Sequence, residues 1–504
     1  MNSNKQKRIA QNAIALYIRL GIQLIIGFYT SRLILEVLGI EDYGIYNIVG
    51  GFVLLFTFLQ GSLTQGTQRF LTFELGKKNQ ENVRNVFCTS MNIYFIFGVL
   101  IVILLCLIGF FWFDDFLNIP RTRLETAKVV YFLSVCTLFF QLISTPYNAL
   151  IIAHEDIKSF AYIDLIYTIL NLLSILFLKY ISVSNSLLIY SILVTGISIL
   201  IRFVYSSFCK KRYKEAVYRF YWDKKLFYEI VSFSGWITLS SLSELLRKQG
   251  INLLLNNVFG VVANAALAVA NQVNGFINRF ASNLQTAYVP QLVKSYAEDN
   301  LKQTRSLIYT GAKMCCILLI FFSVPLMIEV DFILSFWLKE VPSYANILLQ
   351  LILLETIMRS MTYSMNSVIR ATGKIRNYEI VLNIIQIILF VFCVVFTYVY
   401  ENVVTPFIVL IISAICTNCY MIYYCSKVIG ISIKDYVIHV CINCFLMLLL
   451  SLTFSYIVFC NFSEGFYRLI LVCLASSLVI VLCLFTFVLS CKEKQLILKL
   501  LRRK

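Results

Sequence analysis

Long apolar windows separated by short polar breaks make up most of this chain. Windows of about twenty apolar residues, the length that crosses a bilayer, recur about fourteen times. A helix satisfies its own backbone hydrogen bonds in lipid, so the pattern predicts an all-α integral membrane protein with about 14 transmembrane helices. The predicted spans are 12–34, 45–68, 86–112, 129–153, 160–179, 186–209, 231–255, 261–288, 306–328, 344–369, 378–400, 404–426, 435–460 and 467–490.

The eighth span carries a regular polar stripe. Amide side chains recur every seven residues at Asn264, Asn271, Asn278 and Gln285, and Arg279 follows the third of them. Seven residues are close to two helical turns, so these amides share one face of the helix. Such a face either ties neighbouring helices together or lines a water-filled cavity. We favour the cavity, because an arginine adjoins the stripe.

Three more spans are polar along one side. Spans three, six, nine, thirteen and fourteen are nearly all apolar, so polarity is concentrated in spans one, two, seven and eight. This division predicts a central hydrophilic cavity inside an apolar shell. The polar positions are Asn12, Arg19, Gln23 and Thr30 in span one, Gln60, Thr64 and Gln68 in span two, and Ser234, Thr238, Ser241, Glu244, Arg247, Lys248 and Asn252 in span seven.

Two pairs of similar segments indicate an internal repeat. The segment 38–44, around Gly39, resembles 259–265, around Gly260, at an offset of 221 in the numbering. The segment 148–158 resembles 366–376 at an offset of 218. Six spans separate the copies, and an even number makes the two halves parallel. We predict an N-lobe over 1–209, a cytoplasmic linker over 210–230, a C-lobe over 231–426, and two extra helices with a basic tail over 427–504.

Charge refines the topology. The chain is 60% hydrophobic and 14% charged, with a formal net charge of +17. Its basic residues cluster in alternate loops, whereas the other loops are short and lean acidic, as the positive-inside rule requires. Both termini are therefore predicted to be cytoplasmic, with 114–123 on the opposite side. Because the basic residues stand between spans rather than in a free basic patch, we predict no nucleic-acid partner and expect contact with membrane lipids instead.

The sequence offers no catalytic or metal-binding constellation. Cys441 and Cys444 have CxxC spacing but lie in an apolar span without a second pair, and His154 and His439 are far apart. A phosphate-binding loop of the Walker type is also missing. We predict a protein that is not an enzyme, has no metal or cofactor, and is coupled, if at all, to a proton or sodium ion.

The predicted cavity is cationic. Arg19, Arg247, Lys248 and Arg279 outnumber Glu244 on the four polar spans. Glu244 is spaced to pair with Arg247 or Lys248 on its own helix, so a local salt bridge would explain part of this charge. Arginine binds phosphate bidentately, so we predict an anionic, phosphate-bearing substrate. The predicted substrate-binding residues are Arg19, Gln23, Gln60, Arg247, Lys248, Asn271, Asn278 and Arg279.

Three acids at membrane depth are candidates for binding a coupling ion. Asp164 lies in span five and Glu355 in span ten, and Glu244 is the third. Acids in a membrane are costly unless they pair, bind an ion or protonate. Glu355 has Arg359 four residues away and is compatible with a structural ion pair. Asp164 is the better candidate for ion coupling.

The segments Thr30–Gly51 and Thr67–Gly76 resemble bacterial polysaccharide flippases of the Wzx type. That family is similar to MATE drug exporters and lipid II flippases. The resemblance implies a V-shaped, two-lobed fold, alternating access, and an undecaprenyl-pyrophosphate-linked oligosaccharide as cargo in the bacterial inner membrane, with O-antigen or lipopolysaccharide synthesis as the setting. It carries a cargo-binding role onto Arg19 and Arg279. A mid-span arginine in span two is missing, because Arg69 lies at its cytoplasmic end.

Two other functions remain open. The first is a cation-coupled small-molecule exporter of the MATE type. Twelve spans and an acidic cavity would favour that function. A membrane glycosyltransferase or polymerase would need a large outer loop with catalytic acids, and the predicted outer loops are short. Association with polysaccharide polymerase machinery is a further expectation of the flippase hypothesis.

Overall fold

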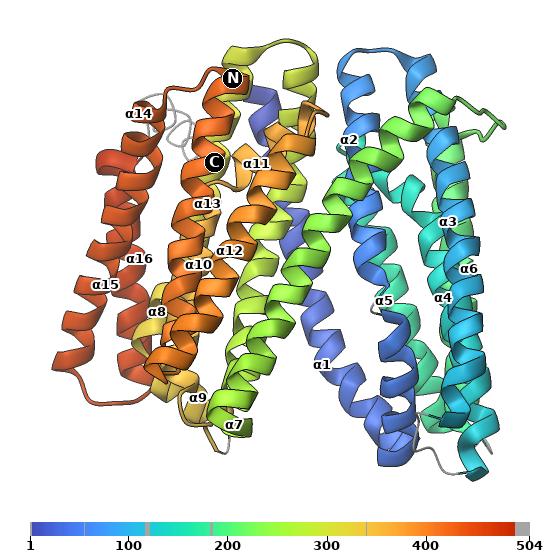
Figure 1. The fold of residues 1–504 in the computed structure, drawn as a ribbon, viewed down its shortest axis with the longest axis horizontal. Coiled ribbons are helices and arrows are strands. Elements are labelled where there is room, and N and C mark those ends of the chain that lie inside the picture. Colours follow the sequence, from blue (N-terminus) through green and yellow to red (C-terminus); the bar gives the residue numbers. More distant parts are fainter. Residues whose placement is uncertain (1–2, 55, 116–120, 182–184, 339, 489–504) are drawn as a thin grey trace. The chain divides into compact units, whose positions relative to one another are not determined.

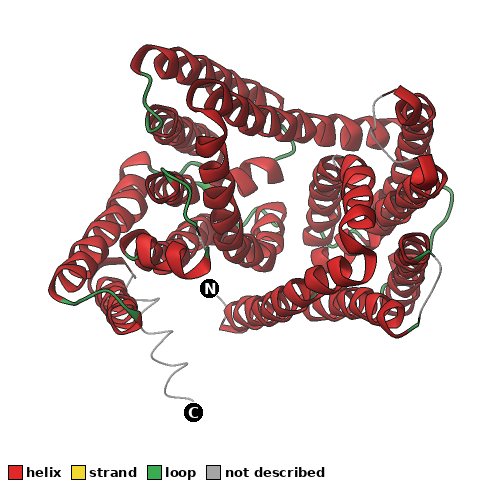
Figure 2. Ribbon diagram, turned by 90° about the horizontal axis from the view of Figure 1, so that it is seen from below, coloured by secondary structure: helices red, strands yellow, loops and turns green. Residues whose placement is uncertain are grey.

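In the computed structural model the chain is built from helices. The structure describes residues 3–54, 56–115, 121–181, 185–338 and 340–488, and within them it contains no strand (Figures 1 and 2). The predicted basic tail and part of the predicted outer loop 114–123 lie outside these residues. The helices of the first half are α1 (Ser3–Leu54), α2 (Thr57–Gly76), α3 (Gln80–Asp115), α4 (Arg121–Ala153), α5 (Ile157–Tyr180), α6 (Ser186–Arg212) and the 3₁₀ turn η1 (Lys214–Ala216).

The second half begins within the longest helix, α7 (Lys224–Ala297). It contains two short π-helical stretches, one between α14 and α15 and one that follows α16. Its elements are α8 (Leu301–Ile328), α9 (Val330–Trp337), α10 (Ala345–Ser360), α11 (Tyr363–Ala371), α12 (Arg376–Tyr400), α13 (Thr405–Ile429), α14 (Ile433–Tyr436), η2 (Val437–Ile442), α15 (Asn443–Asn461), α16 (Phe466–Cys483) and η3 (Leu484–Val488).

The chain forms two compact units, residues 1–241 and 242–504. The first turns of α7 belong to the first unit because they pack closely on α2. A Cβ atom at Gly66 of α2 would lie 2.2 Å from Oγ of Ser234, so only glycine allows this approach. Ser62 Oγ also donates a hydrogen bond to Ser241 Oγ, at 3.3 Å. The sequence placed the lobe boundary earlier, at the linker 210–230.

The expected membrane spans correspond to the helices. Eleven helices in the described residues are long and apolar enough to cross a membrane. α1 and α7 each hold two spans, because their backbone leaves helical geometry at Gly39 and Gly260. With these two divided, α2 joined to the end of α1, and α10 joined to α11, the helices follow the fourteen predicted spans. The protein is an all-α, multi-pass membrane protein.

The backbone confirms the internal repeat. Gly39 has φ 77° and ψ 171°, and Gly260 has φ 78° and ψ −174°, a conformation essentially restricted to glycine. Lys78 and Asp299, also related by the offset of 221, both have positive φ, at 58° and 54°. The second offset, of 218, relates Glu155 to a glycine with positive φ, Gly373. Matching turns at both offsets show that the two halves repeat one helical plan.

The helix ends after these turns match as well. Asn79 caps α3 by accepting a hydrogen bond from the Asn82 backbone N–H at 3.1 Å. Asn300 caps α8 by accepting one from the Gln303 backbone N–H, also at 3.1 Å. An asparagine cap satisfies an N–H that the helix itself leaves unpaired. The same local chemistry therefore starts the third helix of each half.

An apolar core holds the first unit together. It is centred on α1, α3, α4, α5 and α6, with buried side chains that include Leu105, Tyr131 and Ile175. In Figure 1, α3, α4 and α6 run side by side. Tyr131 Oη donates to the Leu105 carbonyl at 2.7 Å, which satisfies its hydroxyl inside the apolar core. This packing supports the polar positions that face away from the core.

Two buried contacts attach the last helices to the second unit. Arg468 of α16 binds Glu329 bidentately, with both nitrogen–oxygen distances at 2.8 Å. Lys313 of α8 donates to the carbonyl of Val488 at 2.7 Å. Each buried charge thus has a partner, as a low-dielectric setting requires. Both contacts therefore tie α16 and its extension η3 to the second copy of the repeat.

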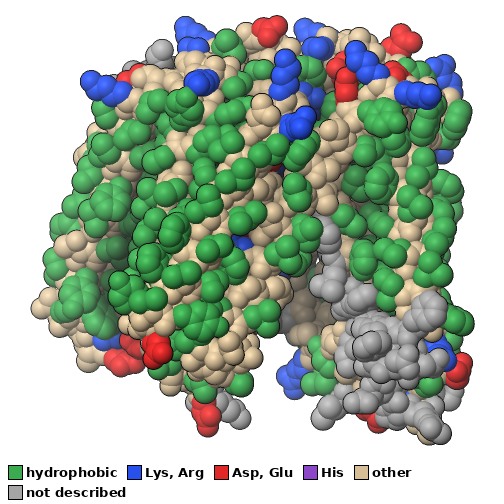
Figure 3. Space-filling model, in the orientation of Figure 1, with side chains coloured by type: hydrophobic (Ala, Val, Ile, Leu, Met, Phe, Trp, Pro, Cys, Tyr) green, Lys and Arg blue, Asp and Glu red, His purple; other side chains and the backbone are tan. Residues whose placement is uncertain are grey.

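The surface has the character expected in a bilayer. Figure 3 shows hydrophobic side chains along the length of the helices in each unit, while Lys and Arg side chains gather mainly at one end of them, at the top of the view. Exposed apolar residues such as Ile387, Phe110 and Leu474 are what lipid would cover.

Candidate functional site

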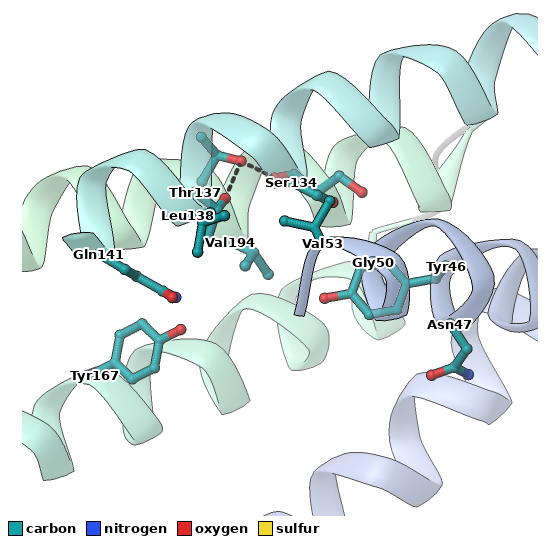
Figure 4. A pocket seen from close by; sticks show the side chains of 12 residues that line it. Tyr46, Asn47, Gly50, Val53, Ser134, Thr137, Leu138, Gln141, Tyr167 and Val194 are labelled. Carbon is teal, nitrogen blue, oxygen red and sulfur yellow. Dashed lines mark hydrogen bonds between the residues drawn. The ribbon is translucent and has the colours of Figure 1, made fainter. Parts of the chain in front are cut away.

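The first unit contains a polar cavity of about 190 Å³ between α1, α4, α5 and α6. Its polar lining is neutral and consists of hydroxyl and amide groups. Figure 4 shows Gln141 and Tyr167 pointing toward one another across the cavity. Thr137 Oγ1 and Thr195 Oγ1 lie 2.9 Å apart in a hydrogen bond on its wall. The lining residues are Tyr46, Asn47, Gly50, Val53, Ser134, Thr137, Leu138, Gln141, Tyr167, Ser191, Val194 and Thr195.

The second unit contains a larger cavity of about 530 Å³, lined by α7, α10, α11 and α13. Its wall combines an amide stripe with acidic and basic side chains. Thr356 Oγ1 donates to Asn274 Oδ1 at 3.0 Å and thereby joins α10 to α7. The polar residues that line it are Glu244, Arg247, Lys248, Gln249, Asn252, Asn271, Asn274, Asn278, Glu355, Thr356, Arg359 and Tyr363.

The two cavities occupy equivalent places in the repeat. The offset of 221 relates their linings on α1 and α7, and the offset of 218 relates those on α4 and α10. At four of the seven equivalent positions a neutral residue of the first cavity corresponds to an amide or a charged residue of the second, namely Asn271, Asn274, Glu355 and Arg359. The equivalent lining residues are Tyr46 and Leu267, Gly50 and Asn271, Val53 and Asn274, Ser134 and Ile352, Thr137 and Glu355, Leu138 and Thr356, and Gln141 and Arg359.

The charged side chains of the second cavity form one network. Arg247 holds Glu244 bidentately, through Nη2 at 2.6 Å and Nε at 3.1 Å. Lys248 Nζ lies 3.7 Å from the same carboxylate, and so does Arg359 Nη1. Arg359 Nε lies 2.6 Å from Glu355 Oε1. Three cations thus share two carboxylates.

A separate cluster in the first unit joins α1 to α5. Arg19 Nη1 lies 3.3 Å from Asp164 Oδ2, and the Arg19 guanidinium stacks on the Phe160 ring, 5.0 Å from its centroid. Gln23 donates to Asp164 at 2.7 Å and to Thr168 at 3.1 Å. The sequence treated Arg19 as a cation without a local partner and Asp164 as an ion site. The structure pairs them, although they lie on helices that are distant in the sequence.

The predicted site residues therefore fall into separate groups. Arg247, Lys248, Asn271, Asn278, Glu244 and Glu355 line the second cavity, whereas Arg19, Gln23 and Asp164 form the cluster just described. Gln60 donates to Thr145 Oγ1 at 3.2 Å, on the α2–α4 contact. Arg279 is exposed on α7, with its guanidinium 5.6 Å from the Phe276 ring centroid.

Sequence reasoning missed two features of the second cavity. Asn274 is a cavity amide that stands between the heptad positions of the stripe, three residues after Asn271. Arg359 was assigned to a local pair with Glu355, although it also reaches Glu244 on another helix. The repeat offsets align them with Val53 and Gln141, which only the structure shows to line a cavity.

Comparison with known proteins gives the family. Residues 9–296 match the family described as "Polysaccharide biosynthesis protein". The chain belongs to this family. The match covers more than half of the chain, including all of the first unit's cavity and part of the second. None of the curated proteins compared matches the chain.

Solved structures of transporters share the fold of this family member. A MATE protein in complex with MaD3S aligns with a TM-score of 0.73 at 14% identity, over 84% of this chain and 96% of its own. An outward-facing multidrug resistance MATE transporter of the MOP superfamily gives 0.72 at 14% identity, with 84% and 96% covered. A MOP superfamily transporter from Pyrococcus furiosus, titled for the reverse polarity of its binding pocket, gives 0.70 at 14% identity, with 85% and 97% covered.

At this identity the likeness shows the fold alone, which is that of MATE and MOP superfamily transporters. The chain is therefore a multi-pass membrane protein of the polysaccharide biosynthesis family with the fold of these transporters. Within the described residues, no group of three or more His, Cys, Asp or Glu side chains is arranged to hold a metal ion.

Proposed function

We propose that this protein is a flippase that moves an undecaprenyl-pyrophosphate-linked oligosaccharide from the cytoplasmic to the periplasmic leaflet of the bacterial inner membrane. It would work by alternating access, without catalysis, and with both termini in the cytoplasm. One observation carries the proposal: a chain of the polysaccharide biosynthesis family has the fold of membrane exporters. The family supports a role in polysaccharide biosynthesis, and the fold supports transport across the membrane as that role.

The chemistry of the second cavity supports this cargo. Amides from Asn271, Asn274 and Asn278 offer both donors and acceptors, which suits the hydroxyl groups of a glycan. Arginine and lysine beside them suit an anion. A cavity for cationic drugs would be expected to carry an excess of acids instead, and here the cations are in excess.

Arg19 and Arg279 are proposed to contact the pyrophosphate of the carrier, as the sequence predicts. Arg279 is exposed and contacts an aromatic ring, so its guanidinium is available to a phosphate. Arg19 is held by Asp164, so cargo binding there would compete with an existing ion pair. Arg19→Ala alone would also strand a carboxylate. The informative test of Arg19 is therefore the pair Arg19→Gln and Arg19→Gln with Asp164→Asn, beside Arg279→Ala and Arg279→Lys.

Coupling to a proton or sodium ion is proposed at Asp164, Glu244 or Glu355. Each of these acids already contacts a cation, so an ion or proton would have to bind as that contact opens. The variants Asp164→Asn and Glu244→Gln test the assignment. If both keep full transport and its dependence on an imposed ion gradient, neither Asp164 nor Glu244 carries the coupling ion, which leaves Glu355.

Deletion of the gene in its native host tests the function itself. The expected result is loss of surface polysaccharide together with accumulation of the lipid-linked oligosaccharide, reachable by modifying enzymes only from the cytoplasmic side. Restoration of display by the wild-type gene is the control. Normal display with increased sensitivity to cationic drugs would instead identify a small-molecule exporter, the function that the fold alone would equally allow.

A deletion strain with normal lipid-linked repeat units but short surface chains would point to polymerisation. Association with polymerase machinery is part of the proposal and is tested separately, by co-purification with the host's polymerase. The lipopolysaccharide or O-antigen setting follows from the identity of the lost polymer.

A further inference from the structure

The charged network of the second cavity is not required by the fold. At the equivalent positions of the first unit, Thr137 replaces Glu355 and Gln141 replaces Arg359. Glu244 corresponds, at the offset of 221, to Gln23. The same helical plan is thus built in the first unit with neutral groups. Since burying charges is costly even when they pair, their presence in one copy only calls for a functional reason.

The network carries an excess of positive charge. Arg247, Lys248 and Arg359 contribute three cations, whereas Glu244 and Glu355 contribute two carboxylates. One further anion would neutralise the group. Lys248 is 67% exposed and lies on the cavity wall, so it remains accessible to a ligand.

Arg359 has hydrogen-bonding capacity to spare. Its Nη2 atom is buried and has no hydrogen-bond acceptor among the described residues. Its Nη1 atom lies 3.7 Å from Glu244, beyond hydrogen-bond distance. Arg247, by contrast, uses two nitrogens on that same carboxylate. Arg359, which lines the cavity, therefore has a hydrogen-bond donor that no carboxylate takes up.

We propose that this cavity binds an oxyanion of the cargo at Arg359 and Lys248, and that Glu244 is an internal carboxylate which the oxyanion displaces from these two cations. Glu244 then keeps its bidentate contact with Arg247, so its charge stays paired throughout. Asn271, Asn274 and Asn278 flank the anion and receive the neighbouring hydroxyl groups. The identity of the cargo rests on the proposed function, whereas the anion site rests on the cavity alone.

The shared chemistry of the ligand is a carboxylate or phosphate next to sugar hydroxyls. Such an anion could come from an acidic sugar of the oligosaccharide or from the pyrophosphate of its carrier. Both present two oxygens to the planar fork of an arginine. Isothermal titration of the purified full-length protein, with D-glucuronate and with inorganic pyrophosphate at equal ionic strength, separates the two sources. Glucose is the neutral control.

Glu244→Gln is the decisive variant, because it should improve binding rather than damage it. Removing the internal anion frees Arg359 and Lys248, so we expect about tenfold tighter binding of at least one of the two probes. The combined change Glu355→Thr and Arg359→Gln, which copies the first unit, should weaken binding about tenfold or more. Lys302→Gln, an exposed charge outside the cavity, should leave it unchanged.

Tighter binding of glucuronate assigns the site to an acidic sugar, and tighter binding of pyrophosphate alone assigns it to the carrier. Unchanged or weaker binding of both probes by Glu244→Gln, in a protein with a wild-type unfolding temperature, overturns the proposal. The titration needs no transport. A protein that binds these anions but is dispensable for polysaccharide display would refute the flippase function and leave the anion site standing. A protein that is needed for display but does not bind these anions would refute the anion site and leave the flippase function standing.

Discussion

The two cavities of the repeat have the same position in their units and opposite character. The first is neutral and small, at about 190 Å³, and hydroxyl groups such as Thr137 and Thr195 satisfy each other on its wall. The second is larger, at about 530 Å³, and holds five charged side chains in one network. One backbone plan thus tolerates both linings. The contrast separates what the helices need in order to pack from what the site needs in order to bind.

The loss of one polar partner destabilises the two cavities to different extents. A hydroxyl or amide that loses its partner in the first cavity leaves one polar group to be satisfied by water. In the second, loss of one cation strands a carboxylate in a low-dielectric interior. Substitutions at equivalent positions should therefore have unequal effects, and this inequality can be measured.

The largest effect is expected for Arg359→Ala. It removes the partner of Glu355, which is 13% exposed, so we expect a loss of about 3–5 kcal/mol in the free energy of unfolding. Gln141→Ala, at the equivalent position, should cost about 1 kcal/mol or less because it leaves no charge behind. Denaturant unfolding of both variants in detergent gives the comparison. Equal losses would mean that the charged network is not a separate feature of the second unit.

The next largest destabilisation is expected at the glycine kinks that the two halves share. Gly39→Ala and Gly260→Ala should each destabilise the protein by about 1–3 kcal/mol, because only glycine adopts this backbone conformation readily. Gly235→Ala is the control: Gly235 lies in a regular helix, and a Cβ atom added there would have nothing within 4 Å, so alanine should be neutral or slightly stabilising. A large loss at only one of the two kinks would argue against a common plan.

A smaller effect is expected when the second cavity is converted to the first. Glu355→Thr together with Arg359→Gln removes the pair as a unit, and replacing buried pairs by neutral groups is often harmless. We expect the free energy of unfolding of the double variant to lie within about 1 kcal/mol of the wild-type value and well above that of Arg359→Ala. Thermal unfolding of the double variant and both single variants completes the cycle. A double variant as unstable as Arg359→Ala would show that these charges are structural after all.

The sequence could predict features that recur in both halves of the chain and features that lie on a single helix. The offsets of 221 and 218 predicted a repeat from short similar segments, and the structure then placed matching glycine kinks and turns at those same offsets. The heptad stripe located Asn271 and Asn278, since both lie on one helix face. Arg19 and Asp164 were assigned separately, because their contact joins helices that are distant in sequence. Helical periodicity carries no information about such a contact.

Arg359 illustrates a different limit. A glutamate and an arginine four residues apart form a complete pair by local rules, so nothing in the spacing signals a third partner. Only the packing of α10 against α7 brings Glu244 within 3.7 Å. The close approach of Gly66 to Ser234, which joins α2 to the start of α7, is likewise a contact that composition does not signal.

The smallest effect is expected where the first unit has a contact that its repeat lacks. His154, in the turn after α4, hydrogen-bonds Glu215 through Nε2 at 2.5 Å and stacks on Tyr213, which holds the linker 210–230 to this turn. His154→Ala should raise trypsin cleavage at Lys210 and Lys211 a few-fold, because a partly exposed pair contributes about 1 kcal/mol or less. Thr372→Ala, at the equivalent position of the second half, should leave cleavage unchanged.

The pH dependence of this clamp follows from Glu215. Burial would raise the pKa of Glu215, but its hydrogen bond to His154 and a backbone hydrogen bond outweigh burial and hold the pKa below the ordinary value of 4.5. A carboxyl group whose pKa is lower in the folded state stabilises that state at pH above 4.5, and the contribution is lost as pH falls through the folded-state pKa. Amide hydrogen exchange over 213–216 should therefore show constant protection from neutral pH down to about 5 and a decline at lower pH, after correction for the intrinsic exchange rate. Glu215→Gln should remove that decline. Protection that already falls between pH 7 and 6 would contradict control by the Glu215 carboxyl group.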